Sequence, residues 1–187
     1  MTKKELYHIC RANGIPPLLY EWSFTKEFED GKIKKILSSL FDEIDSFIRG
    51  RNVWYVCFNN SAISSKIGAS FFKIAILEGY YNTRYTTIEN LAGYRRENWY
   101  EDGDVYNNIL TSDFLVIDKI SHKMEEFQRK IWNKFVEDRL LMKRSTIFVG
   151  LVEHNKQGVF DNRAVDLLKD VDVKILTDKG VIPVVRE

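Results

Sequence analysis

The chain has 187 residues, of which 44% are apolar and 29% are charged, and 28 basic side chains nearly balance 27 acidic ones. This composition suits one globular domain with a real core, and it excludes wholesale disorder, which needs low hydrophobicity and high net charge. A formal charge of +1 disfavours a strongly basic nucleic-acid module. Two cysteines and three scattered histidines give neither a disulfide framework nor zinc-like spacing. Without a signal peptide or an apolar run of membrane-spanning length, we expect a cytoplasmic protein with no membrane partner.

The first fifty residues predict an N-terminal arm followed by one amphipathic helix. Residues 4–12 favour a short helix, which ends before a turn or extended segment because Pro16 and Pro17 restrict the residue that precedes each of them. From Ile33 to Ile48, apolar residues recur every three or four positions, which predicts one buried helix face. Gly50 then supplies a stop signal.

The next segment predicts a central strand, a loop and a helix. Residues 52–58 are apolar at nearly every position and rich in β-formers, as in a strand that is covered on both faces. Residues 59–66 are small and polar apart from one isoleucine, which predicts a loop. A second apolar helix is expected from Ile67 to about Gly79.

Strands continue to alternate with helices to the end of the chain. The expected strands are 84–87, 113–118 and 145–150. One helix is expected from about residue 88, and two others at 122–142 and 161–168. The segments 171–176 and 181–185 are expected to form a hairpin. Residues 94–104 are polar, aromatic and glycine-interrupted, which predicts an exposed excursion. The alternation predicts a three-layer α/β sandwich with a mostly parallel sheet and a short C-terminal β-hairpin. We expect one domain over 1–187, with an arm and helix at 1–50 and an αβα core at 51–187.

The loop after the first strand resembles a phosphate-binding loop that has lost its key residues. In such folds ligands bind beyond the carboxyl ends of the strands, and a phosphate loop there has the form G-x-x-x-x-G-K-[ST]. The lysine matches, but asparagine and serine replace the two glycines and isoleucine replaces the hydroxyl that holds magnesium. The candidate residues of this degenerate nucleotide site are Asn60, Ser61, Ser64, Ser65, Lys66 and Ile67.

The strand at 113–118 shows the same loss. Magnesium-dependent nucleoside triphosphatases end such a strand in two acids, which hold the metal and orient water. Here Asp118 is the first acid, and Lys119 replaces the second. A lysine cation there cannot act as the general base, and it would repel magnesium. Taken alone, Lys66 is typical of a solvated residue at the start of a helix, and Asp118 is typical of a turn or cap. Because both follow strands at whose carboxyl ends ligands bind in such folds, their joint occurrence favours a degenerate nucleotide site.

Several segments, in this order and spacing, resemble the ATPase domain of bacterial replicative-helicase loaders, the DnaC/DnaI-type, IstB-like branch of the AAA+ superfamily. Nearly the whole chain is covered, and the resemblance implies a P-loop, AAA+-like core. Where the family places a polar sensor after the third strand, this chain has Phe-Val-Gly-Leu at 148–151. Leu167 stands where a second arginine is expected, whereas Arg163 fits the first. The similar segments are 12–24, with a Gly-Ile-Pro turn before an aromatic stretch, 50–56, 112–118, 139–147 and 162–168.

The resemblance combined with the lost motifs predicts a catalytically degenerate, helicase-loader-like pseudo-ATPase without a resident cofactor. It would act in DNA replication of a phage or another mobile element by binding a replicative helicase, a host helicase loader or DNA. Two alternatives stay open. The first is an inhibitor or adaptor that captures a host replication protein. The second is a slow or atypical ATPase that binds ATP or ADP through Lys66 and Asp118.

The resemblance also suggests contact residues outside the nucleotide site. Arg163 is a candidate trans arginine that completes a neighbour's site in an oligomer, with a surface salt bridge as the alternative. Basic and aromatic side chains are candidates for contact with single-stranded DNA or a protein partner, with a solvated helix face and core packing as their alternatives. These candidates are Arg95, Arg96, Trp99, Tyr100, Lys143 and Arg144, together with Lys32, Lys34, Lys35 and Tyr106.

Overall fold

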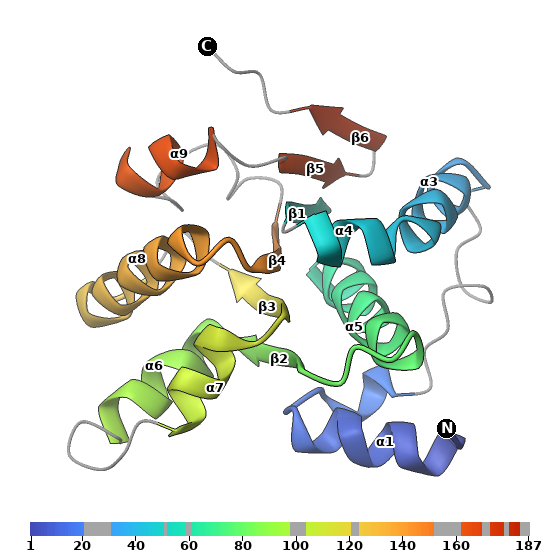
Figure 1. The fold of residues 1–187 in the computed structure, drawn as a ribbon, viewed down its shortest axis with the longest axis horizontal. Coiled ribbons are helices and arrows are strands. Elements are labelled where there is room, and N and C mark those ends of the chain that lie inside the picture. The colour runs from blue at the N-terminus through green and yellow to red at the C-terminus, as the bar shows by residue number, and fades with distance from the viewer. Residues whose placement is uncertain are drawn as a thin grey trace.

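A computed structural model places a single sheet between two layers of helices (Figure 1). The described residues are 1–20, 31–50, 52–58, 61–97, 104–120, 124–151, 162–169, 173–177 and 180–183. Within them the strand order is β2-β3-β4-β1-β5-β6. The strands are β1 (Val53–Phe58), β2 (Thr83–Thr87), β3 (Phe114–Ile120), β4 (Ser145–Leu151), β5 (Val173–Thr177) and β6 (Gly180–Pro183). The predicted three-layer α/β fold is confirmed.

Among the described strands, β1 to β5 are parallel, and β6 runs antiparallel against β5. β1 lies in the middle, pairing Val53 with Thr146 on one side and with Val173 on the other. All of its side chains are buried, as expected for a strand that is apolar on both faces. β5 and β6 form the predicted terminal hairpin.

One helical layer consists of the N-terminal elements and the helix that follows β1. α5 packs across β1, β3 and β4, and its apolar residues join α4 and the arm in one core cluster. Lys73 of α5 is buried and donates to the Leu19 carbonyl at 2.9 Å, which fastens the arm to the core. The elements of this layer are α1 (Lys3–Ala12), the 3₁₀ turn η1 (Pro17–Leu19), α3 (Gly31–Asp42), α4 (Ile44–Gly50) and α5 (Ser61–Leu77).

The second layer covers the opposite face of the sheet, seen on the left of Figure 1. A separate core cluster lies there, built around Trp132 and Phe135 of α8 and closed by Ala164 of α9. The predicted helix at 122–142 is present, with bounds of Glu126–Leu141. The elements are α6 (Ile88–Glu97), α7 (Asp104–Thr111), α8 (Glu126–Leu141) and α9 (Asn162–Leu168).

Three predicted boundaries were wrong. The first long helix is interrupted at Glu43, so it forms α3 and α4. The expected excursion at 94–104 is helical up to Glu97, and a helix that the pattern did not indicate, α7, begins at Asp104. The third wrong boundary is the start of α5, which lies in the candidate site.

Candidate functional site

Helix α5 begins at Ser61, six residues before the predicted start at Ile67. The predicted loop at 59–66 is therefore helical from Ser61 onward, while Asn60 lies outside the described residues and only the backbone of Ser61 is described. In a helix, each backbone N–H from the fifth residue on donates to the carbonyl four residues earlier. A phosphate loop instead directs successive N–H groups at the phosphates. At Ser65 and Lys66 the backbone N–H groups therefore donate to carbonyls of the helix itself.

The side chains of this first part of α5 have structural contacts. Ser64 is buried, and its hydroxyl accepts a hydrogen bond of 3.0 Å from the Phe58 N–H at the end of β1. Lys66 is half-buried, and its carbonyl accepts a hydrogen bond from the Ser70 hydroxyl. Ile67 is fully buried in the core cluster beneath α5. Ser64 thus joins the helix to the strand, and Ile67 packs inward.

A β-bulge stands where β3 carries its carboxylate. Ile117 pairs with Phe148 but Ile120 pairs with Gly150, so β3 has one extra residue against β4 at this point. Lys119 has a φ of 60°, a left-handed conformation uncommon outside glycine. Its side chain is exposed, while that of Asp118 is 2% exposed.

The buried carboxylate of Asp118 accepts three hydrogen bonds from the protein. Ser65 of α5 donates its hydroxyl to Oδ1 at 3.0 Å, and the Lys119 N–H donates to the same oxygen at 2.7 Å. Tyr85 of β2 donates its phenolic hydroxyl to Oδ2. Burial raises the pKa of Asp118 above its usual value, and these hydrogen bonds oppose that shift. Burial also raises the pKa of Tyr85 well above its usual value, with the Asp118 charge adding to it.

Three features of these residues differ from those of a magnesium–nucleotide site. Both oxygens of Asp118 are engaged by protein donors, Ile67 supplies no hydroxyl, and the segment that would wrap the phosphates is helical. Among the described residues, no group of three or more His, Cys, Asp or Glu side chains gathers as metal ligands do. The edge is instead a closed hydrogen-bond network that joins α5, β2 and β3.

The other predicted contact residues that the structure describes lie apart from this network. Arg163 forms a salt bridge with Glu137 of α8 at 2.8 Å, and its side chain is 70% exposed. Tyr106 is buried against Phe135, so the expectation that it stacks on bases was wrong. Lys143 and Arg144 line one cleft at the opposite edge of the sheet. Trp99, Tyr100 and the side chains of Arg95, Arg96 and Lys32 lie outside the described residues.

The sequence reasoning missed two residues that organise the structure. Tyr85 was placed in a strand, but its bond to Asp118 needed the strand order, which sets Thr87 beside Asp118. Arg139, in the last turn of α8, is 1% exposed among the buried apolar residues of that helix. The one feature of the sequence that indicated its burial was its position among inward-facing residues at helical spacing.

No protein-family model matches the sequence, and neither does any curated protein sequence. Within the described ranges, no helix is both long and apolar enough to cross a membrane.

Solved structures of replication proteins do match the fold. The structure of the DnaC helicase loader superposes with a TM-score of 0.68 and 12% identity, over 87% of this chain and 99% of that one. A DNA replication initiation factor and the AMPPCP-bound DnaA of Aquifex aeolicus each give a TM-score of 0.63, with 11% and 14% identity. Each of these two matches covers 83% of this chain and 49% of the other, so the chain spans about half of their length. The chain therefore shares its fold with the DnaC helicase loader and with DnaA, as its sequence resemblance implied.

Proposed function

We propose that this chain is a replication protein that uses the helicase-loader fold for binding and does not hydrolyse ATP. The observation that carries the proposal is the closed network around Asp118, with donors from Ser65, Tyr85 and the Lys119 N–H. A magnesium ion at this place would have to compete with these donors for the carboxylate oxygens. The helical start of α5 supports the same conclusion on the phosphate side.

The partner in this proposal is a replicative helicase or a helicase loader, because structures of replication proteins share the fold. The same similarity supports a role in the cytoplasm, where replication takes place. We infer a phage or other mobile element as the setting, since such an element can use a loader-like protein that binds without turnover. Genes for a helicase, primase or integrase beside this one are the expected neighbourhood.

Calorimetric titration with ATP, with and without Mg²⁺, tests the first half of the proposal. We expect no magnesium-dependent binding and no phosphate release above the buffer rate. Lys66→Ala should not change either result, and Lys130→Ala is the matched control, because Lys130 is an exposed lysine of α8. Magnesium-dependent turnover that is lost in Lys66→Ala and kept in Lys130→Ala would establish a slow ATPase instead.

Purified helicase and purified helicase loader, each mixed separately with this chain, test the second half. Co-elution with either protein on gel filtration is the expected result. An unwinding assay then separates the two binding functions, because a loader-like protein raises helicase activity and an inhibitor or adaptor lowers it. A chain that co-elutes with neither protein contradicts the proposed role.

Arg163 stays a proposed trans arginine for a neighbouring protein. Its salt bridge with Glu137 lies on the surface, where such pairs contribute little. The guanidinium could therefore leave Glu137 at small cost. If it serves a partner's ATPase site, Arg163→Ala should lower the partner's ATP turnover without weakening co-elution.

A further inference from the structure

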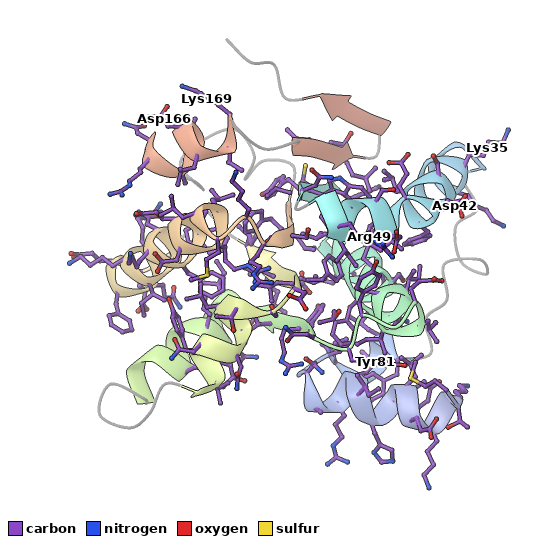
Figure 2. The ribbon with its side chains drawn as sticks, viewed as in Figure 1. Lys35, Asp42, Arg49, Tyr81, Asp166 and Lys169 are labelled. Carbon is purple, nitrogen blue, oxygen red and sulfur yellow. The ribbon has the colours of Figure 1, made fainter. Side chains whose placement is uncertain are left out.

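A cleft of about 410 Å³ lies at the amino ends of β3 and β4, at the opposite end of these strands from Asp118. It is formed where α4 ends, where α8 ends and where the chain leaves α5. Figure 2 labels Arg49 at the end of α4 and Tyr81 on the chain between α5 and β2. The lining residues are Ile48, Arg49, Tyr80, Asp113, Met142, Lys143, Arg144 and Ser145.

The walls of this cleft are held in place by hydrogen bonds. Ser145 is buried and donates its hydroxyl to the carbonyls of Phe47 and Ile48, at 3.0 Å each, which fastens the end of α4 to β4. The Tyr80 hydroxyl donates to Asp45, which also forms a salt bridge of 2.9 Å with Arg49. The cleft is therefore a preformed surface between fixed elements.

The lining carries more positive than negative charge. Among the described residues that line the cleft, Arg49, Lys143 and Arg144 are cations and Asp113 is a carboxylate. Asp113 forms a salt bridge with Arg144, and the neighbouring Asp45 forms one with Arg49, so three cations lie beside two carboxylates. The side chains of Arg49 and Arg144 are 75% and 40% exposed. A guanidinium has five N–H donors, more than one carboxylate can accept, so each arginine can bind a second acceptor in the cleft.

Lys143 stands in a backbone conformation that favours glycine. It follows the end of α8 with a φ of 51°, where its N–H donates to the Leu140 carbonyl and the next N–H, that of Arg144, donates to the Arg139 carbonyl. This pairing is a Schellman motif, whose left-handed position is usually glycine or asparagine. A lysine in that position adds steric cost and places a cation at the rim, which points to a role for its charge.

The cleft also offers apolar surface. Met142 of the lining is 44% exposed, and Leu141, which precedes it outside the lining, is 55% exposed, whereas Ile48 of the lining is buried. Arginine, tyrosine and methionine are enriched at protein interfaces. Apolar contact beside a cationic rim fits a bulky apolar side chain next to a carboxylate.

We propose that this cleft binds a protein segment in which an aspartate or glutamate lies beside a bulky apolar residue. The inference deepens the proposed binding function and rests on it, because it names the surface and the chemistry of the protein partner. Single-stranded nucleic acid fits less well. Its repeating phosphates would pass Asp45 and Asp113, two half-exposed carboxylates that repel a polyanion, whereas a peptide needs to place only one carboxylate among the cations.

Titrations followed by NMR on the side-chain Nε–Hε signals of Arg49 and Arg144 test the inference. The probes are a short synthetic peptide that alternates aspartate with leucine, a peptide that alternates aspartate with serine, and an oligodeoxythymidine. We expect the aspartate–leucine peptide to shift both signals saturably, and the aspartate–serine peptide to bind more weakly. No shift with the first peptide, or tighter binding of the oligodeoxythymidine at the same signals, overturns the inference.

Lys143→Gly separates lost binding from lost folding. Glycine adopts the left-handed backbone conformation without strain, so the urea midpoint of unfolding should rise. The loss of one cation should weaken binding of the aspartate–leucine peptide about tenfold. Lys130→Gln, which removes an exposed cation of α8 at another place, should leave peptide affinity unchanged. Unchanged affinity in Lys143→Gly contradicts the proposed site.

The two proposals fail separately. If the purified helicase or loader co-elutes with Lys143→Gly as strongly as with the wild type, the cleft is not the docking site and the replication role stands. If the aspartate–leucine peptide binds in the cleft but neither protein co-elutes, the cleft is supported and the proposed replication partner is wrong.

Discussion

Tyr85 donates its phenolic hydroxyl to the Asp118 carboxylate across two adjacent parallel strands, β2 and β3. Both side chains are nearly inaccessible to solvent, at 4% and 2% exposure. A buried carboxylate is costly unless protein donors replace its water. Tyr85 therefore stabilises a residue that, in a magnesium-dependent ATPase, would be stabilised by the metal.

Tyr85→Phe should lower the free energy of unfolding by about 1.5–3 kcal/mol, because it removes a hydrogen bond to a charged group and leaves that charge buried. Urea unfolding at neutral pH measures the change. Tyr81→Phe is the matched control, since Tyr81 is 72% exposed and should change stability by less than about 0.5 kcal/mol. Equal effects of the two substitutions would contradict a stabilising role for the Tyr85 hydroxyl.

Asp118→Asn tests the charge at the same place. Burial raises the folded-state pKa of Asp118, so the folded protein holds this proton more tightly than the unfolded chain does. As pH rises from the unfolded pKa, about 3.9, through the folded one, the wild type loses stability that asparagine does not lose. The wild-type free energy of unfolding, measured relative to that of Asp118→Asn, should therefore fall as pH rises above about 4.

Urea titrations of both proteins at a series of pH values between acid and neutral provide the comparison. The matched control is Asp166→Asn, which removes an exposed carboxylate of α9 that pairs with Lys169. This control should change the free energy of unfolding at neutral pH by less than about 0.5 kcal/mol, as expected for an exposed surface pair. A constant difference for Asp118→Asn would mean that the carboxylate titrates as it does in the unfolded chain.

Most of the fold could be predicted from local sequence patterns. The fully apolar run of β1 and the apolar strand that ends at Asp118 were both located, because a parallel sheet that is covered on both faces leaves a continuous signal. The C-terminal hairpin was also located from its turn residues. These features depend on short segments, which a single sequence shows directly.

The candidate site was less predictable because its geometry depends on contacts between distant segments. Small polar residues at 61–66 read as a loop, yet Ser64 bonds to Phe58 and Ser65 bonds to Asp118, which stabilises a helical start. A propensity argument cannot include partners that lie 53 positions away in sequence. The departures from the phosphate and metal motifs are visible in the sequence, but the hydrogen-bond network around Asp118 is not.

Arg139 gives a third prediction. It donates to the carbonyls of Leu110, Ser112 and Ser145 at 2.7–2.8 Å, which closes the C-terminus of α7 and joins it to β4. Burial lowers its pKa to about 9, so it stays charged at neutral pH. A cation is favourable at the negative end of a helix.

Arg139→Met should cost about 3–5 kcal/mol, because several buried carbonyls lose a charged donor together. Arg139→Lys should cost less, since lysine keeps the charge but has three donors on one nitrogen. Arg11→Met, at an exposed position of α1, is the control and should change stability by less than about 0.5 kcal/mol. If methionine is tolerated as well as lysine, packing rather than hydrogen bonding holds this position.

Gly68 and Gly93 give a paired prediction with opposite signs. A Cβ on Gly68 would lie 2.7 Å from Cγ2 of Val149 and 3.2 Å from Cγ1 of Val116, because α5 approaches the sheet closely there. Overpacking should cost about 1–3 kcal/mol and helix propensity should return about 1 kcal/mol, so we expect Gly68→Ala to destabilise the protein by up to about 2 kcal/mol. On Gly93 of α6, a Cβ would meet no atom of the described residues within 4 Å, so Gly93→Ala should stabilise by about 0.5–1 kcal/mol.

Val149→Ala provides the test of cause for Gly68, because it removes the methyl group that the new Cβ would strike. The double variant with Gly68→Ala should be more stable than the sum of the two single changes predicts, by about 1 kcal/mol or more. Combining Val149→Ala with Gly93→Ala should give simple additivity, since α6 lies on the other face of the sheet. An additive result for Gly68 as well would mean that α5 shifts to accept alanine, and that the close approach to Val149 does not fix its position.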